Sequence, residues 1–296
     1  MPASAPDPYP SRRVAAPQLL PRQDPVLHGG PDAPGPLARD ELLAFERDGW
    51  LLRRGVFSAA EAAALADEVE RLAGIADETR ISEPDAPAVR SLFAIHRGDG
   101  PLARAQRDRR VAGLARQILA DEVAFHQSRV NRKPAFDGRE FSWHSDFETW
   151  HVEDGLPAMR VLSAMVMLTP NTAANGPLLV IPGSHIVFVS CVGEAPPDHH
   201  RTSLRRQQYG VPDRASLTAL ASGRGVEAAL GGPGDVVIFD GNLLHASGGN
   251  LSPLPRCNLF AVYNAVGNAP GRPYGGGSPR PAHVAEPAPQ PAAGSP

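Results

Sequence analysis

The chain has 296 residues and a formal net charge of −3, which is enough length for one large domain that buries its own core. This charge balance does not point to nucleic acid or to an anionic membrane as a partner. The two cysteines, Cys191 and Cys257, form no CxxC pair, and so few thiols favour a reducing compartment over a disulfide-bonded secreted protein.

The two ends of the chain differ in composition from its middle. Residues 1–36 are rich in proline and predict an N-terminal arm that is partly extended or disordered, and residues 271–296 predict a similar C-terminal tail. Residues 37–270 are predicted to form the folded domain. No apolar run approaches the roughly 18 residues of a transmembrane helix, and residues 1–10 lack the apolar core of a secretory signal. We therefore expect a cytoplasmic protein.

The first half of the domain has the pattern of helices. Leu42 and Phe45 fall on one face of an amphipathic segment, and the string SAAE at residues 58–61 is a capping box that opens an Ala/Leu/Glu-rich segment. A third segment carries apolar residues at helical spacing on an arginine-rich background. The predicted helices are 38–48, 58–72 and 101–119.

From residue 123 onward the pattern changes to short apolar runs separated by Gly, Pro and Asn turns. The predicted strands are 123–131, 159–168, 178–181, 236–239 and 259–266, with a helical insertion over 203–222. Several strands that follow a mainly helical first half predict a mainly β fold with flanking helices, a jelly roll or β-sandwich.

The string FSWHSDFETWHVE, at residues 141–153, contains candidate metal ligands. On a strand, His144 and Asp146 point to the same side and can reach one ion. His245, just beyond the predicted strand 236–239, is the best candidate for a third ligand. Two histidines and one carboxylate leave positions of Fe(II) open for a 2-oxo acid and O2, which a closed four-ligand site would not.

A lone His-x-Asp string is often no more than a hydrogen-bonded pair, and other histidines compete as ligands: His126, His151, His185, His199 and His200. Arg256 strengthens the metal interpretation because it follows His245 at about a strand's length. Its guanidinium is suited to the far carboxylate of a dicarboxylic co-substrate. Lys133 is the one lysine in the chain, which indicates either a functional role or chance.

Longer motifs carry a resemblance to a known family: FERDGWLLRRGVF, HQSRVNRKP, WHSDFETWHVEDG, NGPLLVIPGSH, FDGNLLHASGGN and PRCNLFAVYNAV. With them the chain resembles the ectoine hydroxylases, a branch of the phytanoyl-CoA dioxygenase superfamily. The resemblance implies a double-stranded β-helix (jelly roll, cupin-like) with His144, Asp146 and His245 as iron ligands. It further implies 2-oxoglutarate contacts by Phe93, Gln127, Asn131, Ser247 and Arg256. The substrate contacts that it implies are Arg129, Trp150, Phe239, Asn258 and Phe260.

The resemblance implies the hydroxylation of ectoine to 5-hydroxyectoine, with Fe(II), 2-oxoglutarate and O2 consumed to give succinate and CO2. Aromatic faces suit the cationic ring of ectoine. The alternatives are a related dioxygenase acting on another small amino acid or an acyl-CoA, and a non-catalytic cupin-like metal-binding protein. A halogenase is disfavoured because Asp146 is present. A second copy of the chain, in a homodimer, is a partner to consider, whereas nucleic acid and membranes are not expected.

Overall fold

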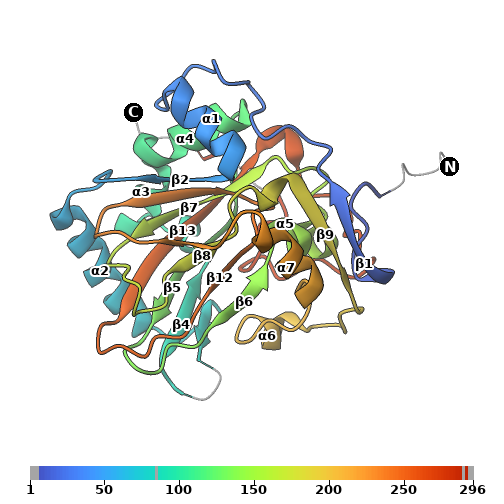
Figure 1. Cartoon of the computed structure of the whole chain (residues 1–296). Helices are drawn as coiled ribbons and strands as arrows, with labels where there is room; N and C mark the ends of the chain where they lie inside the picture. Colours follow the sequence, from blue (N-terminus) through green and yellow to red (C-terminus); the bar gives the residue numbers. More distant parts are fainter. Residues whose placement is uncertain (1–6, 84–85, 289–290, 293–296) are drawn as a thin grey trace.

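A computed structural model describes residues 7–83, 86–288 and 291–292 of the chain (Figure 1). Its named strands pair antiparallel and form three sheets. The large sheet has the order β2 (Trp50–Arg53), β11 (Val236–Asp240), β7 (Val161–Met167), β13 (Arg256–Ala265), β5 (Val123–Lys133), β4 (Val89–Phe93) and β3 (Arg80–Ser82). The small sheet has the order β10 (Glu227–Ala229), β8 (Leu178–Val180), β12 (His245–Ser247) and β6 (Phe141–His144). The third sheet pairs β1 (Arg13–Pro21) with β9 (Val187–Val192).

Both faces of the large sheet are buried. One face packs against the helices α1 (Arg39–Asp48), α2 (Ala59–Ala73), α3 (Pro101–Arg107) and α4 (Arg109–Leu119) (Figure 1). Along β7, Leu162, Ala164 and Val166 belong to this helix-side core, whereas Met165 and Met167 belong to a second core shared with the small sheet. Side chains alternate between the faces of a strand, so a strand buried on both faces is apolar throughout. The mainly β, jelly-roll prediction is confirmed.

The helices differ from the prediction at two places. The predicted helix 101–119 is wrong as one element, because Asp108 has a non-helical backbone and divides it into α3 and α4. The Asp108 side chain accepts a hydrogen bond from the backbone N–H of Arg110 at 2.8 Å and so caps the second helix. Of the predicted helical insertion 203–222, only its second half is a helix, α7 (Arg214–Ser222); a short helix, α6 (His200–Ser203), lies almost entirely before it. The other two helices and all five predicted strands are present, with ends shifted by a few residues.

Both terminal segments contact the rest of the molecule. In the predicted arm, β1 pairs with β9 and Tyr9 is buried; in the predicted tail, Val284 and Ala285 are buried. The division of the chain at residues 36 and 270 stays a prediction. Within the described part of the chain, no helix has the length and apolar character needed to cross a membrane.

Candidate active site

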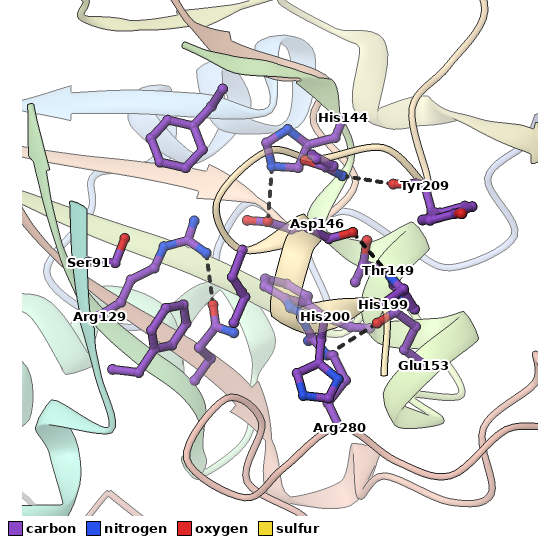
Figure 2. Close-up of a pocket in the computed structure, with 17 residues that line it drawn as sticks. Ser91, Arg129, His144, Asp146, Thr149, Glu153, His199, His200, Tyr209 and Arg280 are labelled. Carbon is purple, nitrogen blue, oxygen red and sulfur yellow. Dashed lines mark hydrogen bonds and ion pairs between the residues drawn. The ribbon is translucent and has the colours of Figure 1, made fainter. Parts of the chain in front are cut away.

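The structure brings His144, Asp146 and His245 together at one end of the space between the two larger sheets. His144 ends β6, His245 begins β12, and the two residues lie opposite each other in the ladder. Asp146 begins α5 (Asp146–Thr149), and the extended backbone of Ser145 keeps it on the same side as His144. The ligating atoms of the three side chains lie within 4.8 Å of one another. Figure 2 shows the contact between His144 and Asp146 at the cavity wall.

Hydrogen bonds fix the orientation of both imidazole rings. Nδ1 of His144 lies 2.7 Å from the carbonyl oxygen of Ser142, and Nδ1 of His245 lies 2.9 Å from that of Leu243. A carbonyl only accepts, so each Nδ1 donates its proton and each Nε2 keeps a free lone pair. These Nε2 atoms lie 3.5 and 3.8 Å from the carboxylate oxygens of Asp146. Two neutral imidazoles and one carboxylate on one face fit Fe(II) and leave its remaining positions open.

The electrostatics of the triad favour the metal-binding protonation states. Burial lowers the pKa of His245 to about 4, with His144 as a further cause. Burial acts to raise the pKa of Asp146, but the neighbouring His245, His144 and Arg129 outweigh it and hold that pKa well below its ordinary value. A carboxylate and a neutral imidazole are the forms that bind a cation.

A cavity beside the triad, here called the inner cavity, reaches from His144 and His245 to Ser247 and Arg256. The Arg256 guanidinium is buried and donates through Nη1 to the carbonyl of Gly176 and to Ser247 Oγ, while its Nε has no partner. Among the described residues no acidic side chain forms an ion pair with it. Burial lowers its pKa to about 10, so it stays a cation at neutral pH. A buried cation of this kind fits the carboxylate of a bound acid.

A second cavity, the outer cavity, also borders His144 and is lined by Asp146, Gln127, Arg129 and Trp150. Figure 2 labels His144, Asp146 and Arg129 among its lining residues. Arg129 lines both cavities. Its Nη1 donates to Gln127 Oε1 at 3.0 Å, its Nε has no partner, and its guanidinium carbon lies 5.1 Å from the centre of the Phe260 ring. In the described part of the chain no carboxylate pairs with Arg129, so its charge is available to an anionic ligand.

Most of the predicted ligand contacts line these cavities. Asn131, Ser247, Arg256 and Phe260 line the inner cavity, Phe93, Gln127 and Trp150 the outer one, and Arg129 both. Phe239 and Asn258 line neither. The Phe239 ring packs 5.0 Å from that of His245 inside the apolar core, and the Asn258 side chain is hydrogen-bonded to Asn171 and Met165. Their direct contact with a substrate stays a prediction.

Several residues that line the cavities were not predicted from the sequence, and Phe141 and Thr149 are two of them. Phe141 lines both cavities and Thr149 lines the outer one. Phe141 and His144 are three residues apart, so a regular strand would place them on opposite faces. The β6–β12 ladder is irregular there, since Phe141 pairs with Ser247 and His144 with His245. A bulge of this kind leaves no signal in the hydrophobic pattern. Thr149 could have been suggested by its position next to Trp150.

Four of the five competing histidines have other partners. The triad is the one group of three or more His, Cys, Asp or Glu side chains that could share a metal within the described ranges. His126 contacts Asp154, His151 contacts Asp7, His185 contacts the Glu46 carbonyl and His199 contacts Glu153. None of these four is placed to replace His245.

Lys133 is fully buried at the end of β5, where it lies opposite Arg256 in the ladder with β13. Its Nζ donates to the carbonyls of Arg139 and Gly248. Burial lowers the pKa of Lys133 to about 6, and the charges of Arg256 and Arg90 add to this effect. A neutral amine has two N–H groups, which match these two acceptors.

The lowered pKa of Lys133 predicts a pH-dependent stability. Between about pH 6 and its ordinary pKa of 10.5, the unfolded chain binds a proton at this lysine that the folded chain does not. Raising the pH therefore favours the folded state, by up to about 1.4 kcal/mol per pH unit. Urea unfolding should be measured for the wild type and Lys133→Met at a series of pH values. Across this window the free energy of unfolding of the wild type should rise relative to that of the variant. A constant difference between the two would contradict a neutral Lys133.

Two antiparallel sheets that enclose an open His–Asp–His triad define the class of mononuclear, metal-dependent dioxygenases with a double-stranded β-helix fold. The family model described as "Phytanoyl-CoA dioxygenase (PhyH)" matches residues 45–257. The chain belongs to this phytanoyl-CoA dioxygenase family.

Similar proteins within the family include ectoine dioxygenases. The one from Bordetella parapertussis is 51% identical over 285 residues, covering 95% of this chain and 92% of the relative, and that from Sphingopyxis alaskensis is 50% identical over 279 residues, covering 93% and 91%. The crystal structure of EctD from S. alaskensis with 2-oxoglutarate and 5-hydroxyectoine superposes with a TM-score of 0.85 at 46% identity, over 95% of this chain and 94% of that one. The structure of the same protein with bound Fe gives a TM-score of 0.86 at 44% identity, over 97% of each chain.

Proposed function

We propose that this chain hydroxylates ectoine to 5-hydroxyectoine and converts 2-oxoglutarate to succinate and CO2 in the same turnover. The observation that carries the proposal is the near-complete coverage by ectoine dioxygenases at about half identity. The site supports it, because a cavity that contains a buried arginine and a cavity with aromatic and cationic walls both border the open triad. The triad and both cavities argue against a purely structural metal site.

In this proposal the triad holds Fe(II), and Arg256 with Ser247 receives the far carboxylate of 2-oxoglutarate in the inner cavity. Iron held there would supply the oxygen chemistry, which overall places one atom of O2 in succinate as CO2 leaves and the other in hydroxylated ectoine. The residues of the chain orient the two organic molecules and exclude water. Asn131 lies beside Arg256 in the inner cavity and is well placed for the co-substrate. Phe93 and Gln127 lie on the outer side, so their co-substrate contacts have weaker geometric support.

Ectoine would occupy the outer cavity beside Asp146. It is a small zwitterion, with a carboxylate and a delocalised cationic ring. Arg129 offers a guanidinium without a carboxylate partner to the ectoine carboxylate, and Trp150 offers an aromatic face to the ring. Phe260 lines the inner cavity, so its contact with the substrate has weaker geometric support. The carboxylate and the cationic ring of the ligand would thus each meet a complementary group, which would fix the ring carbon that faces the iron.

Succinate release distinguishes this substrate from the alternatives. Protein with iron and 2-oxoglutarate is given ectoine, a small amino acid such as proline, or an acyl-CoA in parallel. We expect ectoine to stimulate succinate formation far above the background without substrate. If only the amino acid or the thioester stimulates it, the dioxygenase assignment stands and the ectoine assignment fails.

Replacing Trp150 with alanine should weaken ectoine binding. The side chain is 2% exposed and its indole packs edge-on to His126, with ring centres 5.3 Å apart. Loss of one cation–π face costs on the order of 1–2 kcal/mol, so the KM for ectoine should rise about tenfold. A misplaced ring should also form more succinate per hydroxylated product. Trp150→Phe keeps an aromatic face and should recover most of the loss, whereas equal effects of both variants would argue against an aromatic contact.

Two further features of the protein are part of this proposal. We place the enzyme in the cytoplasm, because ectoine and 2-oxoglutarate are metabolites of that compartment and both cysteines are unpaired and buried. We also propose a homodimer, which sedimentation equilibrium would test against a monomer.

A further inference from the structure

A short turn, residues 240–244, connects the end of β11 to the metal ligand His245. The carbonyl of Leu243 in this turn accepts the hydrogen bond that orients the His245 ring, at 2.9 Å. The N–H of Leu243 donates to the carbonyl of Asp240, and the N–H of Asn242 donates to the Asp240 carboxylate at 2.8 Å. The conformation of the turn therefore determines the direction in which the imidazole of His245 points.

The Asn242 side chain joins this turn to the other two metal ligands. Its Oδ1 accepts a hydrogen bond from Ser145 Oγ at 3.0 Å, and Ser145 is the residue between His144 and Asp146. Asn242 is 1% exposed and Ser145 is 4% exposed, so water does not compete for this bond. One side-chain contact thus links the turn before one ligand to the residue that separates the other two.

The other end of the Asn242 amide is fixed as well. Its Nδ2 donates to the carbonyls of His185 and Val187, at 2.9 and 3.1 Å. Because a carbonyl only accepts, these two contacts require the amide nitrogen on their side and turn Oδ1 toward Ser145. A carboxylate would lack the two donors, and an apolar side chain would lack the acceptor too. The surroundings of residue 242 therefore call for an amide.

Other contacts hold the backbone of the turn. The carboxylate of Asp240 pairs with Arg22 at 2.8 Å, and these side chains are 5% and 3% exposed. The carbonyl of Gly241 accepts from the N–H of Phe147 at 2.8 Å, and a Cβ on Gly241 would lie only 2.9 Å from Val161 Cγ1. All these contacts remain when the Asn242 side chain is removed, so its removal should affect the link to Ser145 more than the turn itself.

We propose that Asn242 is a positioning residue of the metal site. Through Ser145 it sets the position of the neighbouring ligands, His144 and Asp146, relative to the turn that orients the third ligand. Residues that orient metal ligands in this way raise metal affinity, because the ligands need not rearrange when the ion binds. The inference rests on the metal site of the proposed function, and not on the identity of the substrate.

Metal binding tests the inference without any organic ligand. Metal-free wild type and Asn242→Ala are titrated with Co(II), whose visible absorption depends on its ligands and their geometry. We expect the Kd for Co(II) to rise about 10–100-fold in the variant, and the spectrum of the saturated site to change. A wild-type Kd or a wild-type spectrum in Asn242→Ala would overturn the proposal, since either would show that the triad keeps its geometry without the amide.

Asn268→Ala is the matched control. Asn268 is also a buried asparagine whose side chain joins two segments, by hydrogen bonds with the backbone of Ala158 and with Asn264. It lines neither cavity and contacts no member of the triad. This variant should have a lower Tm, with the wild-type Kd and spectrum for Co(II). If the two asparagine variants changed Co(II) binding equally, the effect would be a general loss of structure, and the proposal would be overturned.

A double-mutant cycle tests the route through Ser145. Ser145→Ala should also weaken Co(II) binding. If both side chains act through their shared hydrogen bond, the variant with both changes should bind Co(II) within about twofold of the weaker single variant. Effects that multiply would mean that Asn242 acts by another route, and would overturn the proposal.

The wild type separates failure of this inference from failure of the proposed function. If the wild type itself binds no Co(II), the proposed metal site fails and the inference fails with it. If the wild type binds Co(II) and Asn242→Ala binds it equally well, the metal site stands and only the inference fails.

Discussion

Replacing Asp146 with alanine should abolish hydroxylation and reduce iron affinity by more than about 100-fold. Loss of a residue that only orients a metal ligand lowers metal affinity by about 10–100-fold, and loss of the ligand itself should lower it more. Asp146 is the one anionic member of the triad, and its low pKa reflects its place beside His245, His144 and Arg129. Without it, two neutral imidazoles remain, which cannot neutralise a divalent cation. The protein should stay folded, since its apolar cores are formed by other residues.

Iron content after gel filtration, product formation and thermal unfolding measure these three effects. Asp48→Ala is a suitable control, because Asp48 is an acidic residue at the end of α1 whose partner is the exposed Arg47. It should bind iron and turn over normally. An Asp146→Ala protein that retains iron and near-normal turnover would show that the triad is not the metal site.

Arg256→Ala should raise the KM for 2-oxoglutarate by at least about tenfold. In the wild type, the Arg256 side chain would make a charge-assisted, two-point contact with the far carboxylate of 2-oxoglutarate, worth roughly 2 kcal/mol or more. Because no acidic partner is left behind among the described residues, the ligand-free protein should lose little stability. Arg256→Lys should recover only part of the affinity, since an ammonium cannot form the same fork.

Thermal unfolding with and without 2-oxoglutarate separates binding from folding. The co-substrate should raise the Tm of the wild type and have little effect on that of Arg256→Ala. Arg132→Ala is the control: Arg132 is the neighbour of Lys133 on β5 and pairs with Glu70 at the surface. If Arg256→Ala keeps the wild-type KM, another residue binds this carboxylate, and the buried Lys133 on the adjacent strand is a candidate, because a bound anion would favour its protonated form.

The parts of the fold and site that the sequence predicted depend on local patterns. The capping box before α2 is read from four consecutive residues, and the double-sided burial of β7 and β13 produces long apolar runs. The His144–Asp146 pair could be placed on one side because the backbone between them is extended. Such features need no knowledge of distant segments.

The features that were missed depend on tertiary contacts. The bulge that turns Phe141 toward the cavities arises from the pairing of β6 with β12, and nothing in the local pattern marks it. Arg12 pairs with Glu148 and Arg280 pairs with Asp154, across more than 120 residues of chain in each case. An arginine in a proline-rich terminal segment has the same local appearance whether it is solvated or paired with a buried carboxylate.

The most direct test of the proposed function follows the two atoms of O2 into the products of one reaction. Protein, iron(II), 2-oxoglutarate and ectoine are combined without oxygen, exposed to isotopically labelled O2, and the products are weighed by mass spectrometry. We predict that ectoine gains a single labelled oxygen atom, that succinate gains one in equal amount, and that omission of iron or 2-oxoglutarate stops both. Unchanged ectoine together with succinate at its substrate-independent background would contradict the proposed function.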